Sequence, residues 1–354
     1  GTVGDIESLP YLEALRQFRM QEGKSNVLFI HVTLVPYLHK AGEVKTKPTQ
    51  HSVGRLREIG IIPDILICRS EKHLETDVRK KLALFCNVDE EAVFESVDVP
   101  NTIYEAPLDF AAQELDSLII DLMGLRAGRR NLKLWREYAD KVVTADREII
   151  IGIVGKYSEL LDAYKSIHES LNHAGAAHST RVVIKSISAE EIEKSGADKV
   201  LQGINGILVP GGFGSRGFEG KIAAVKYARE NKIPFFGICL GMHMAVIEFA
   251  RNILNLQNAN TTEDDPKTPH PVIHLMEEQK KILNMGATMR LGAYPCVLKK
   301  GTLARKAYGK DSISERHRHR FEFNNAYREQ FEANGMVLSG LSPDGNLVEM
   351  IEIK

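Results

Sequence analysis

The sequence is poor in cysteine, in net charge and in long apolar runs. Its four cysteines among 354 residues are scattered and form no C-x-x-C pair, which argues against a disulfide framework and a structural zinc site and favours a reducing compartment. The net charge of -1 gives no polyelectrolyte signature, so nucleic acid is not an implied partner. The most apolar runs, residues 149–154 and 204–209, are far too short to span a bilayer, and no charged-then-apolar leader opens the chain. We therefore expect a cytoplasmic protein without a membrane segment.

The order of the predicted elements indicates an α/β fold in two domains. Apolar strands alternate with helical segments between residues 10 and 97, and again between residues 148 and 254, which is typical of parallel sheets. Residues 124–130 contain glycine and arginine, as expected of a solvated linker. In a doubly wound sheet, ligands bind beyond the carboxyl ends of the strands. We predict a first domain over residues 1–123, a linker over 124–147 and a doubly wound domain over 148–354.

The pentapeptide Gly237-Ile238-Cys239-Leu240-Gly241 has the G-x-C-x-G form of a nucleophile elbow. The apolar residues before it predict a strand, and residues 242–254 predict a helix. A sharp strand-to-helix turn strains the backbone of its central residue, and glycine is needed on either side because a Cβ would clash. At a helix N-terminus the thiolate is favoured, so the pKa of Cys239 should fall below the roughly 8.5 of a free thiol. The alternative is a buried core cysteine without a chemical role.

A glycine-rich loop, Pro210-Gly211-Gly212-Phe213-Gly214, follows a predicted strand one βα unit before the elbow. It is not a phosphate-binding P-loop, because no Gly-Lys-Ser/Thr follows it, and in isolation it would be a tight turn. Next to Cys239, its backbone N–H groups could hold a developing oxyanion, with the N–H of Leu240 as the second donor. Removing one such donor typically costs about 3 kcal/mol of transition-state stabilisation.

Together these two motifs resemble the class I glutamine amidotransferases, in which a cysteine takes the γ-glutamyl group of glutamine and releases ammonia. Three further stretches closely resemble signature stretches of the CTP synthase family: Gly1-Thr2-Val3-Gly4-Asp5-Ile6-Glu7, Lys45-Thr46-Lys47-Pro48-Thr49-Gln50 and Arg316-His317-Arg318-His319-Arg320. The resemblance implies an amidoligase domain that uses ATP and Mg²⁺ to phosphorylate the 4-oxygen of UTP, after which ammonia displaces the phosphate to give CTP. It also implies a ligase of pyrimidine biosynthesis that is inhibited by CTP, activated by GTP and assembled as a homotetramer.

The resemblance assigns two groups of residues in the first domain to nucleotides. The lysine-rich stretch also has a physical rationale: if it is extended, Lys45 and Lys47 lie on one side and can neutralise a polyphosphate, while Pro48 stiffens the turn. Otherwise these are two solvated surface lysines. The residues implied for UTP and CTP are Asp5, Ile6, Glu7, Lys45, Thr46, Lys47, Pro48, Thr49, Gln50 and Lys81. Those implied for ATP are Arg69, Val97, Asp98 and Val99, and no metal ligand is expected in this chain.

The basic stretch 316–320 is not a zinc site by itself, since two histidines are too few. In an extended strand its arginines share one face and its histidines the other. The resemblance implies that Arg318 pairs with the α-carboxylate of glutamine and that Glu263 receives the α-ammonium group, although on sequence alone Glu263 would be a surface loop residue. The residues implied for glutamine are Gly212, Phe213, Leu240, Gly241, Met242, His243, Glu263 and Arg318. Arg216, just after the glycine loop, is a candidate for contacting GTP.

Two departures from the family pattern bear on activity. His243 stands where the family usually has a glutamine that contacts the substrate. The general-base histidine and its glutamate are expected downstream of Lys354, and the P-loop and magnesium ligands upstream of Gly1, so we expect a piece of a longer enzyme that is cut at both ends and inactive by itself. Two other interpretations stay open, an amidotransferase that serves a different synthase and a non-catalytic nucleotide-binding assembly or regulatory protein of the same fold.

Overall fold

A computed structural model describes residues 2–156, 161–275 and 289–353 of the chain. They divide into two compact units, Gly1–Ala145 and Asp146–Lys354. Both are mixed α/β units, which confirms the predicted fold class. In the described ranges we find no helix that is both long enough and apolar enough to cross a bilayer. All four cysteines are free thiols.

The first unit is built on a parallel sheet of three strands in the order β1-β4-β5. Because successive side chains of a strand point to opposite faces, Leu66 packs against α2 and α3, while Ile65 packs against α4 and α5. The unit's elements are β1 (Ile30–Leu34), β2 (Tyr37–Leu38), β3 (Glu43–Val44), β4 (Ile65–Ser70), β5 (Val93–Val97), α1 (Leu9–Glu22), α2 (Lys47–Glu58), α3 (Thr76–Cys86), α4 (Ala106–Ala112), α5 (Leu115–Leu122) and α6 (Lys133–Thr144), with short 3-10 turns η1 (Ile6–Ser8), η2 (Glu90–Ala92) and η3 (Ile103–Glu105).

Part of the predicted linker is helical. Helix α6 packs on the first unit, where Trp135 Nε1 donates a hydrogen bond of 2.8 Å to the carbonyl of Tyr104. Arg130, before α6, pairs with Glu114 and Asp116 at 2.7 Å each. The segment is therefore tied to α5 as well as to η3, and the domain boundaries that we proposed stay a prediction.

The stretch that begins at Lys45 does not form an extended strand, so the condition under which Lys45 and Lys47 would alternate onto one side is not met. Helix α2 begins at Lys47, and Pro48 lies in its first turn, where a fixed φ favours the helix and the missing N–H costs nothing. Both Thr46 and Gln50 are buried, and Gln50 Nε2 donates to Thr46 Oγ1 at 3.0 Å across this turn.

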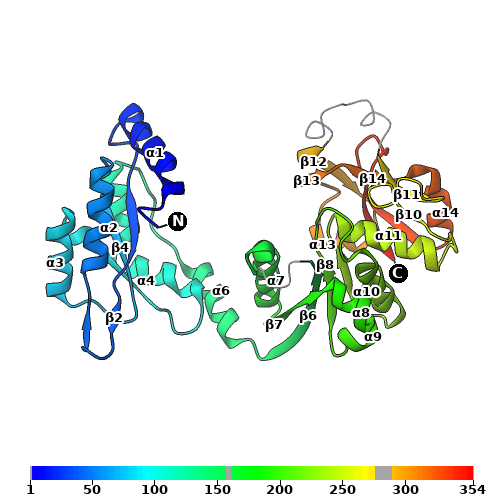
Figure 1. The fold of residues 1–354 in the computed structure, drawn as a ribbon, viewed down its shortest axis with the longest axis horizontal. Coiled ribbons are helices and arrows are strands. Elements are labelled where there is room, and N and C mark those ends of the chain that lie inside the picture. Colours follow the sequence, from blue (N-terminus) through cyan, green and yellow to red (C-terminus); the bar gives the residue numbers. More distant parts are fainter. Residues whose placement is uncertain (1, 157–160, 276–288, 354) are drawn as a thin grey trace. The chain divides into compact units, whose positions relative to one another are not determined.

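The second unit contains a parallel sheet in the order β7-β6-β8-β9 with helices on both faces. Helix α7 covers one face, and α8, α10 and α11 cover the other (Figure 1). The elements of this layer are β6 (Arg147–Gly155), β7 (Thr180–Ser188), β8 (Gly206–Val209), β9 (Phe235–Gly237), η4 (Leu161–Tyr164), α7 (Lys165–Ala177), α8 (Ala189–Ser195), α9 (Ala197–Val200), α10 (Phe218–Glu230) and α11 (Leu240–Asn252). This is the doubly wound sheet that the sequence predicts.

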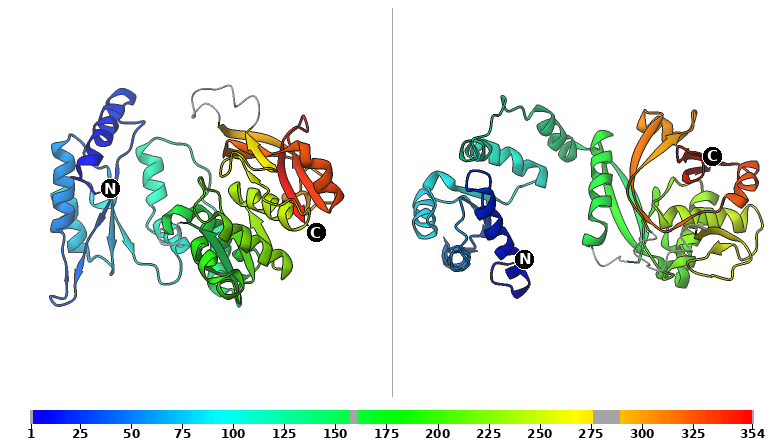
Figure 2. Two further views of the ribbon diagram at one scale, coloured as in Figure 1. Left: turned by 45° about the vertical axis from the view of Figure 1, so that its right-hand side comes forward. Right: turned by 90° about the horizontal axis from the view of Figure 1, so that it is seen from above.

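Two smaller sheets complete the second unit beside α11 (Figure 2). Phe249 of α11 stacks on Phe331 with ring centroids 5.5 Å apart, so these sheets share one core with the parallel layer. Their orders are β10-β11-β14 and β13-β12-β15-β16, the second wholly antiparallel. The elements are β10 (Asn260–Thr261), β11 (Pro271–Leu275), β12 (Arg290–Leu298), β13 (Ser312–His319), β14 (Phe321–Phe323), β15 (Met336–Leu341), β16 (Val348–Ile353), α13 (Leu303–Tyr308), η6 (Asn325–Tyr327) and α14 (Arg328–Ala333).

Candidate active site

Cys239 forms a strained elbow between β9 and α11. Its backbone has φ 53° and ψ -105°, a conformation that a residue with a Cβ rarely adopts. A Cβ added to Gly237 would lie 2.5 Å from the carbonyl of Gly241, and one added to Gly241 would lie 2.1 Å from the carbonyl oxygen of Val209. Neither position has room for a side chain, which confirms the elbow and the reason for its glycines.

The pKa of the Cys239 thiol is raised, and our expectation of a lowered pKa was wrong. Burial is the largest cause, because it disfavours the thiolate, and the carboxylates of Glu263 and Glu322 raise the pKa further. The backbone N–H of Leu240 lowers it but does not compensate. This environment therefore favours the neutral thiol of Cys239 over the thiolate.

A cavity of about 200 Å³ opens beside the thiol. Its wall combines the glycine loop, the first turn of α11, the segment after β10 and the residues that join β13 to β14. The lining residues are Gly212, Phe213, Cys239, His243, Glu263, Met289, His319, Arg320 and Phe321. Four of the residues implied for glutamine therefore border the same cavity as Cys239, while Leu240, Gly241 and Met242 continue the first turn of α11.

The glycine loop lies against the elbow. A Cβ on Gly211 would be 3.4 Å from Cβ of Cys239, and one on Gly212 would be 3.6 Å from Cδ2 of Leu240. The ammonium group of Lys156 donates a hydrogen bond to the carbonyl of Phe213. A side chain at Gly211 would therefore be in contact with Cys239, so the loop passes close to the cysteine.

Two opposite charges border the Phe213 part of the loop. The carboxylate of Glu263 accepts a hydrogen bond of 3.2 Å from the backbone N–H of Gly214. On the other side, the guanidinium carbon of Arg318 lies 5.8 Å from the ring centroid of Phe213. A carboxylate and a guanidinium near one small cavity suit the ammonium and carboxylate groups of an amino acid.

His243 is buried in the wall of this cavity. Its Nδ1 has no hydrogen-bond partner among the described residues, which is unusual for a buried polar atom. Burial and the neighbouring His319 lower the pKa of His243 to about 3, so the imidazole is neutral at physiological pH.

Strand β13 alternates as the sequence predicts, with Arg316 and Arg318 exposed and His317 and His319 half-buried. His317 Nδ1 lies 2.8 Å from His319 Nε2 and 3.7 Å from Glu349 Oε2. Burial lowers the pKa of His319 to about 4, helped by the charge of Arg290 and by His317.

This histidine pair, with Glu349, has the spacing of a metal site, since the three ligand atoms lie within 4.8 Å of one another. The guanidinium of Arg290, however, already binds both oxygens of Glu349, at 2.8 and 3.3 Å, and Glu322 at 3.2 Å. A metal ion would have to compete with this fixed cation, so we interpret the group as a buried hydrogen-bond network. Sequence reasoning missed it, because Arg290, Glu322 and Glu349 carry no local signal.

The residues implied for ATP meet at the carboxyl ends of β4 and β5. Arg69 pairs with Asp98 at 2.6 Å, and the backbone N–H of Asp98 donates to the carbonyl of Ser70 at 3.2 Å. Val97 ends β5, and Val99 follows two residues later. This edge of a parallel sheet is where ligands of such folds bind.

The residues implied for UTP and CTP are only partly brought together. Lys45 pairs with Glu43, and the pKa of Glu43 is lowered chiefly by this hydrogen bond and more weakly by the charge of Lys81, so both lysines lie near one carboxylate. Lys47 lies over the ring of Phe85 at 5.8 Å. The hydrogen bonds of Asp5 stay within the first eight residues, and Ile6 beside it is 86% exposed.

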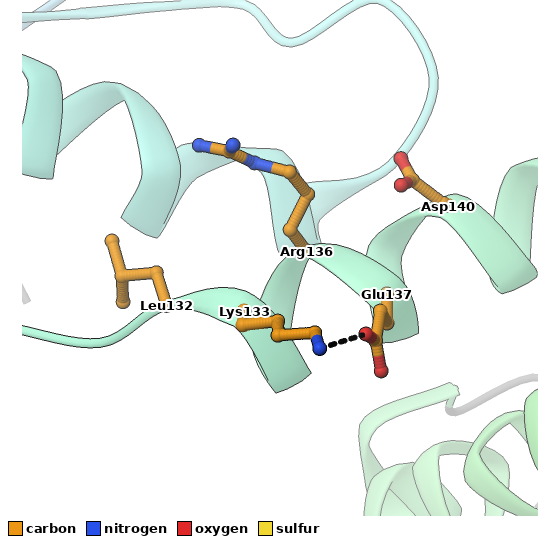
Figure 3. Close-up of a pocket in the computed structure, with 5 residues that line it drawn as sticks. All are labelled: Leu132, Lys133, Arg136, Glu137 and Asp140. Carbon is orange, nitrogen blue, oxygen red and sulfur yellow. Dashed lines mark ion pairs between the residues drawn. The ribbon is translucent and has the colours of Figure 1, made fainter.

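An open hollow of about 300 Å³ lies beside α6 in the first unit. Figure 3 shows its lining, which comes from α6 and the residue before it, and in which Lys133 pairs with Glu137 at 3.9 Å. An exposed ion pair of this kind is common on helices. We assign no function to it.

A strained cysteine elbow, a glycine loop close to it and a doubly wound sheet are the features expected of a class I glutamine amidotransferase, and the second unit has all three. The family model described as "Glutamine amidotransferase class-I" matches residues 159–354, and the model described as "CTP synthase N-terminus" matches residues 1–125. The chain belongs to the CTP synthase family, which confirms the resemblance seen in its sequence.

Curated relatives agree with this assignment. CTP synthases of Syntrophus aciditrophicus and Caldanaerobacter subterraneus are each 56% identical over 354 residues, and that of Staphylococcus aureus is 53% identical. Each alignment covers 100% of this chain and 66% of the relative, so the chain spans about two thirds of their length. A solved structure described as the glutaminase domain of Trypanosoma brucei CTPS with bound acivicin is similar at 37% identity and a TM-score of 0.53, over 58% of this chain and 79% of that one.

Proposed function

We propose that the protein containing this chain is a glutamine-hydrolysing CTP synthase, which aminates UTP in an ATP-dependent reaction. The observation that carries the proposal is the juxtaposition of Cys239 with the glycine loop, next to a cavity that Glu263 and Phe213 line, with the guanidinium of Arg318 near the Phe213 ring. At about 200 Å³ the cavity is smaller than the roughly 300–1,000 Å³ of most ligand pockets, as suits a single amino acid.

In the proposed reaction, glutamine binds with its α-ammonium group at Glu263 and its α-carboxylate at Arg318. The Cys239 thiolate attacks the side-chain amide carbon, and the N–H groups of the glycine loop and of Leu240 stabilise the oxyanion. The carbon–nitrogen bond breaks, ammonia leaves with a proton, and water hydrolyses the thioester to glutamate. His243 lines the cavity, which supports a substrate contact there in the place of the family's glutamine.

The proposed reaction also needs a base that deprotonates Cys239. Since the relatives are longer than this chain, we propose that a histidine outside these residues takes the proton in the full-length protein. The released ammonia then attacks UTP that ATP has activated at the 4-oxygen. Lys45 and Lys81 would bind the triphosphate of UTP or CTP. Arg69 and Asp98, at the carboxyl ends of β4 and β5, would bind ATP.

We further propose, from membership of the family, that the full-length enzyme uses Mg²⁺, responds to GTP and works as a homotetramer in the cytoplasm. Arg216 is the residue that we assign to GTP. Its guanidinium donates to the carbonyl of Lys156 at 2.5 Å and lies 3.7 Å from Glu190, so it is held beside the glycine loop. This position would let an effector act on the Cys239 site.

The proposal is tested by glutamine-dependent conversion of UTP to CTP in the full-length protein, compared with the Cys239→Ala variant. The variant should lose synthesis from glutamine and keep synthesis from free ammonia, because only the thiol is removed. Full glutamine-dependent activity in Cys239→Ala would disprove the nucleophile assignment. Glutaminase activity without binding of UTP or CTP would instead favour an amidotransferase that serves another synthase.

A further inference from the structure

Lys221 is a buried lysine that the proposed mechanism does not use. Lys221 is only 2% exposed. It lies in the first turn of α10, four residues after Gly217, which ends the glycine-rich loop beside Cys239. Its ammonium group donates a hydrogen bond of 2.9 Å to the carbonyl oxygen of Arg216. Burying a cation costs several kcal/mol unless it is paired and hydrogen-bonded, so its place in the core needs a reason.

The charges around Lys221 make this position unfavourable for packing alone. Burial lowers the pKa of Lys221 to about 8, and the cations of Lys156 and Arg216 contribute, while Glu193 and Glu190 oppose the shift. The N-terminus of α10 adds a positive partial charge. Burying an unbranched apolar side chain of similar size here would cost less free energy than burying the lysine.

The first turn of the helix that carries Lys221 packs closely against α8. A Cβ on Gly220 would lie 1.9 Å from the carbonyl oxygen of Ala189, and one on Gly217 would lie 2.7 Å from Cβ of Ala189. In addition, the backbone N–H of Gly220 donates to Glu193 at 3.0 Å. The first turn of α10 is thus packed directly on α8, and the ammonium group of Lys221 is anchored to a fixed point of the fold.

From this point a chain of hydrogen bonds leads to the active site. Lys221 holds the carbonyl of Arg216, and the guanidinium of Arg216 donates to the carbonyl of Lys156 at 2.5 Å. The ammonium of Lys156 in turn donates to the carbonyl of Phe213, which lines the cavity next to Cys239. The end of the loop nearest the helix is therefore linked to the end that faces the cysteine.

We propose that Lys221 is a positioning residue for the Cys239 site: its buried ammonium group fixes the carbonyl of Arg216 and thereby the shape of loop 210–217, whose N–H groups stabilise the oxyanion. The inference rests on the proposed glutamine hydrolysis and adds a residue outside the cavity to it. Because the loop has to be in place only for acyl transfer, the loss of Lys221 should affect glutamine-dependent and not ammonia-dependent synthesis.

The test is Lys221→Met in the full-length protein, a change that keeps an unbranched side chain one atom shorter and removes its charge and donors. We expect kcat for glutamine-dependent CTP synthesis to fall on the order of tenfold, less than the roughly 100-fold or more of removing an oxyanion donor itself. The KM for glutamine should change less than kcat, and ammonia-dependent synthesis should be unchanged. The melting temperature should stay the same or rise, because a buried charge has been removed.

Two control variants sharpen the result. Lys226→Met removes an exposed lysine of the same helix, whose side chain is 48% exposed, and should leave all rates unchanged. Lys221→Arg keeps a cationic donor and should restore part of the glutamine-dependent kcat. A second readout is labelling of Cys239: Lys221→Met should slow labelling by a glutamine-like chloroketone, which uses the oxyanion loop, and not alkylation by iodoacetamide, which does not.

The outcomes separate the possibilities. An unchanged ratio of glutamine- to ammonia-dependent rates in Lys221→Met would overturn the inference, and so would an equal fall of both rates with a lower melting temperature, which indicates a purely structural lysine. If the unmodified protein makes no CTP from either nitrogen source, the proposed function fails, and with it the premise of the inference.

Discussion

Glu263 accepts a hydrogen bond from the backbone N–H of Gly214 at 3.2 Å, and so connects the segment after β10 to the glycine loop beside Cys239. One carboxylate therefore has two tasks in the proposed site. It holds the loop through one oxygen, and it offers negative charge to the ammonium group of glutamine.

These two tasks can be separated by substitution. Glu263→Gln keeps an acceptor for Gly214 and removes the charge, so the KM for glutamine should rise about tenfold or more while kcat changes less. Glu263→Ala removes both functions and should lower kcat as well. Steady-state kinetics with glutamine and with ammonia measure this, and the exposed Glu230→Gln is the matched control. An unchanged KM in Glu263→Gln would remove Glu263 from the substrate site.

The glycine at the end of the elbow should tolerate no side chain. Gly241→Ala would place a Cβ 2.1 Å from the carbonyl oxygen of Val209, which is backbone and has no room to move. We expect the free energy of unfolding to fall by about 3 kcal/mol or more. Urea unfolding followed by circular dichroism measures it, with Gly54→Ala as control, since a Cβ there meets nothing within 4 Å and should be neutral or stabilising.

The buried histidines predict a loss of stability in acid. His243 and His319, with pKa values lowered to about 3 and about 4, are neutral in the folded state and take up a proton on unfolding below pH 6.5. The free energy of unfolding should fall as the pH drops from 7 to 4.5, by about 2–3 kcal/mol for His243. Burial raises the pKa of Glu322 to about 7. Its contribution to the free energy of unfolding therefore increases as the pH drops from 7 to 4.5, opposite to that of the histidines.

The His243→Gln variant isolates one of these contributions. Its free energy of unfolding should depend less on pH between 7 and 4.5 than that of the unmodified protein, by the amount assigned to His243, and the exposed His178→Gln should leave the dependence unchanged. Denaturant titrations at several pH values measure it. An identical pH dependence in both variants would mean that folding does not lower the pKa of His243.

The lysines near Glu43 should act on nucleotide affinity alone. Lys45→Ala and Lys81→Ala should each raise the KM for UTP and weaken inhibition by CTP, by about tenfold, because each removes one cation from the proposed triphosphate site. Glutaminase activity should not change. Lys80→Ala, at an exposed neighbouring position of α3, is the control. Equal effects of Lys80→Ala and Lys81→Ala would indicate a general effect of surface charge.

Features with a local physical cause could be read from the sequence. The order of strands and helices follows from the period of the apolar residues, and the glycines on both sides of Cys239 indicate the sharp, strained turn that needs them. The alternation of arginine and histidine on β13 is likewise a property of any strand. The helix at residues 47–50 was missed, because proline permits a first turn as readily as an extended stretch.

Other features depend on residues that only the tertiary structure brings together. Arg290 and Glu349 are hydrogen-bonded although they lie 59 residues apart in the sequence, and Glu263 and Gly214 although they lie 49 apart. No local sequence pattern predicts either contact. The raised pKa of Cys239 and the burial of Lys221 belong to the same group. The sequence by itself determined which backbone turns and periodic elements form, since these depend on neighbours in the chain. The tertiary structure decided burial and pairing of charge, because desolvation is set by everything that packs around a group.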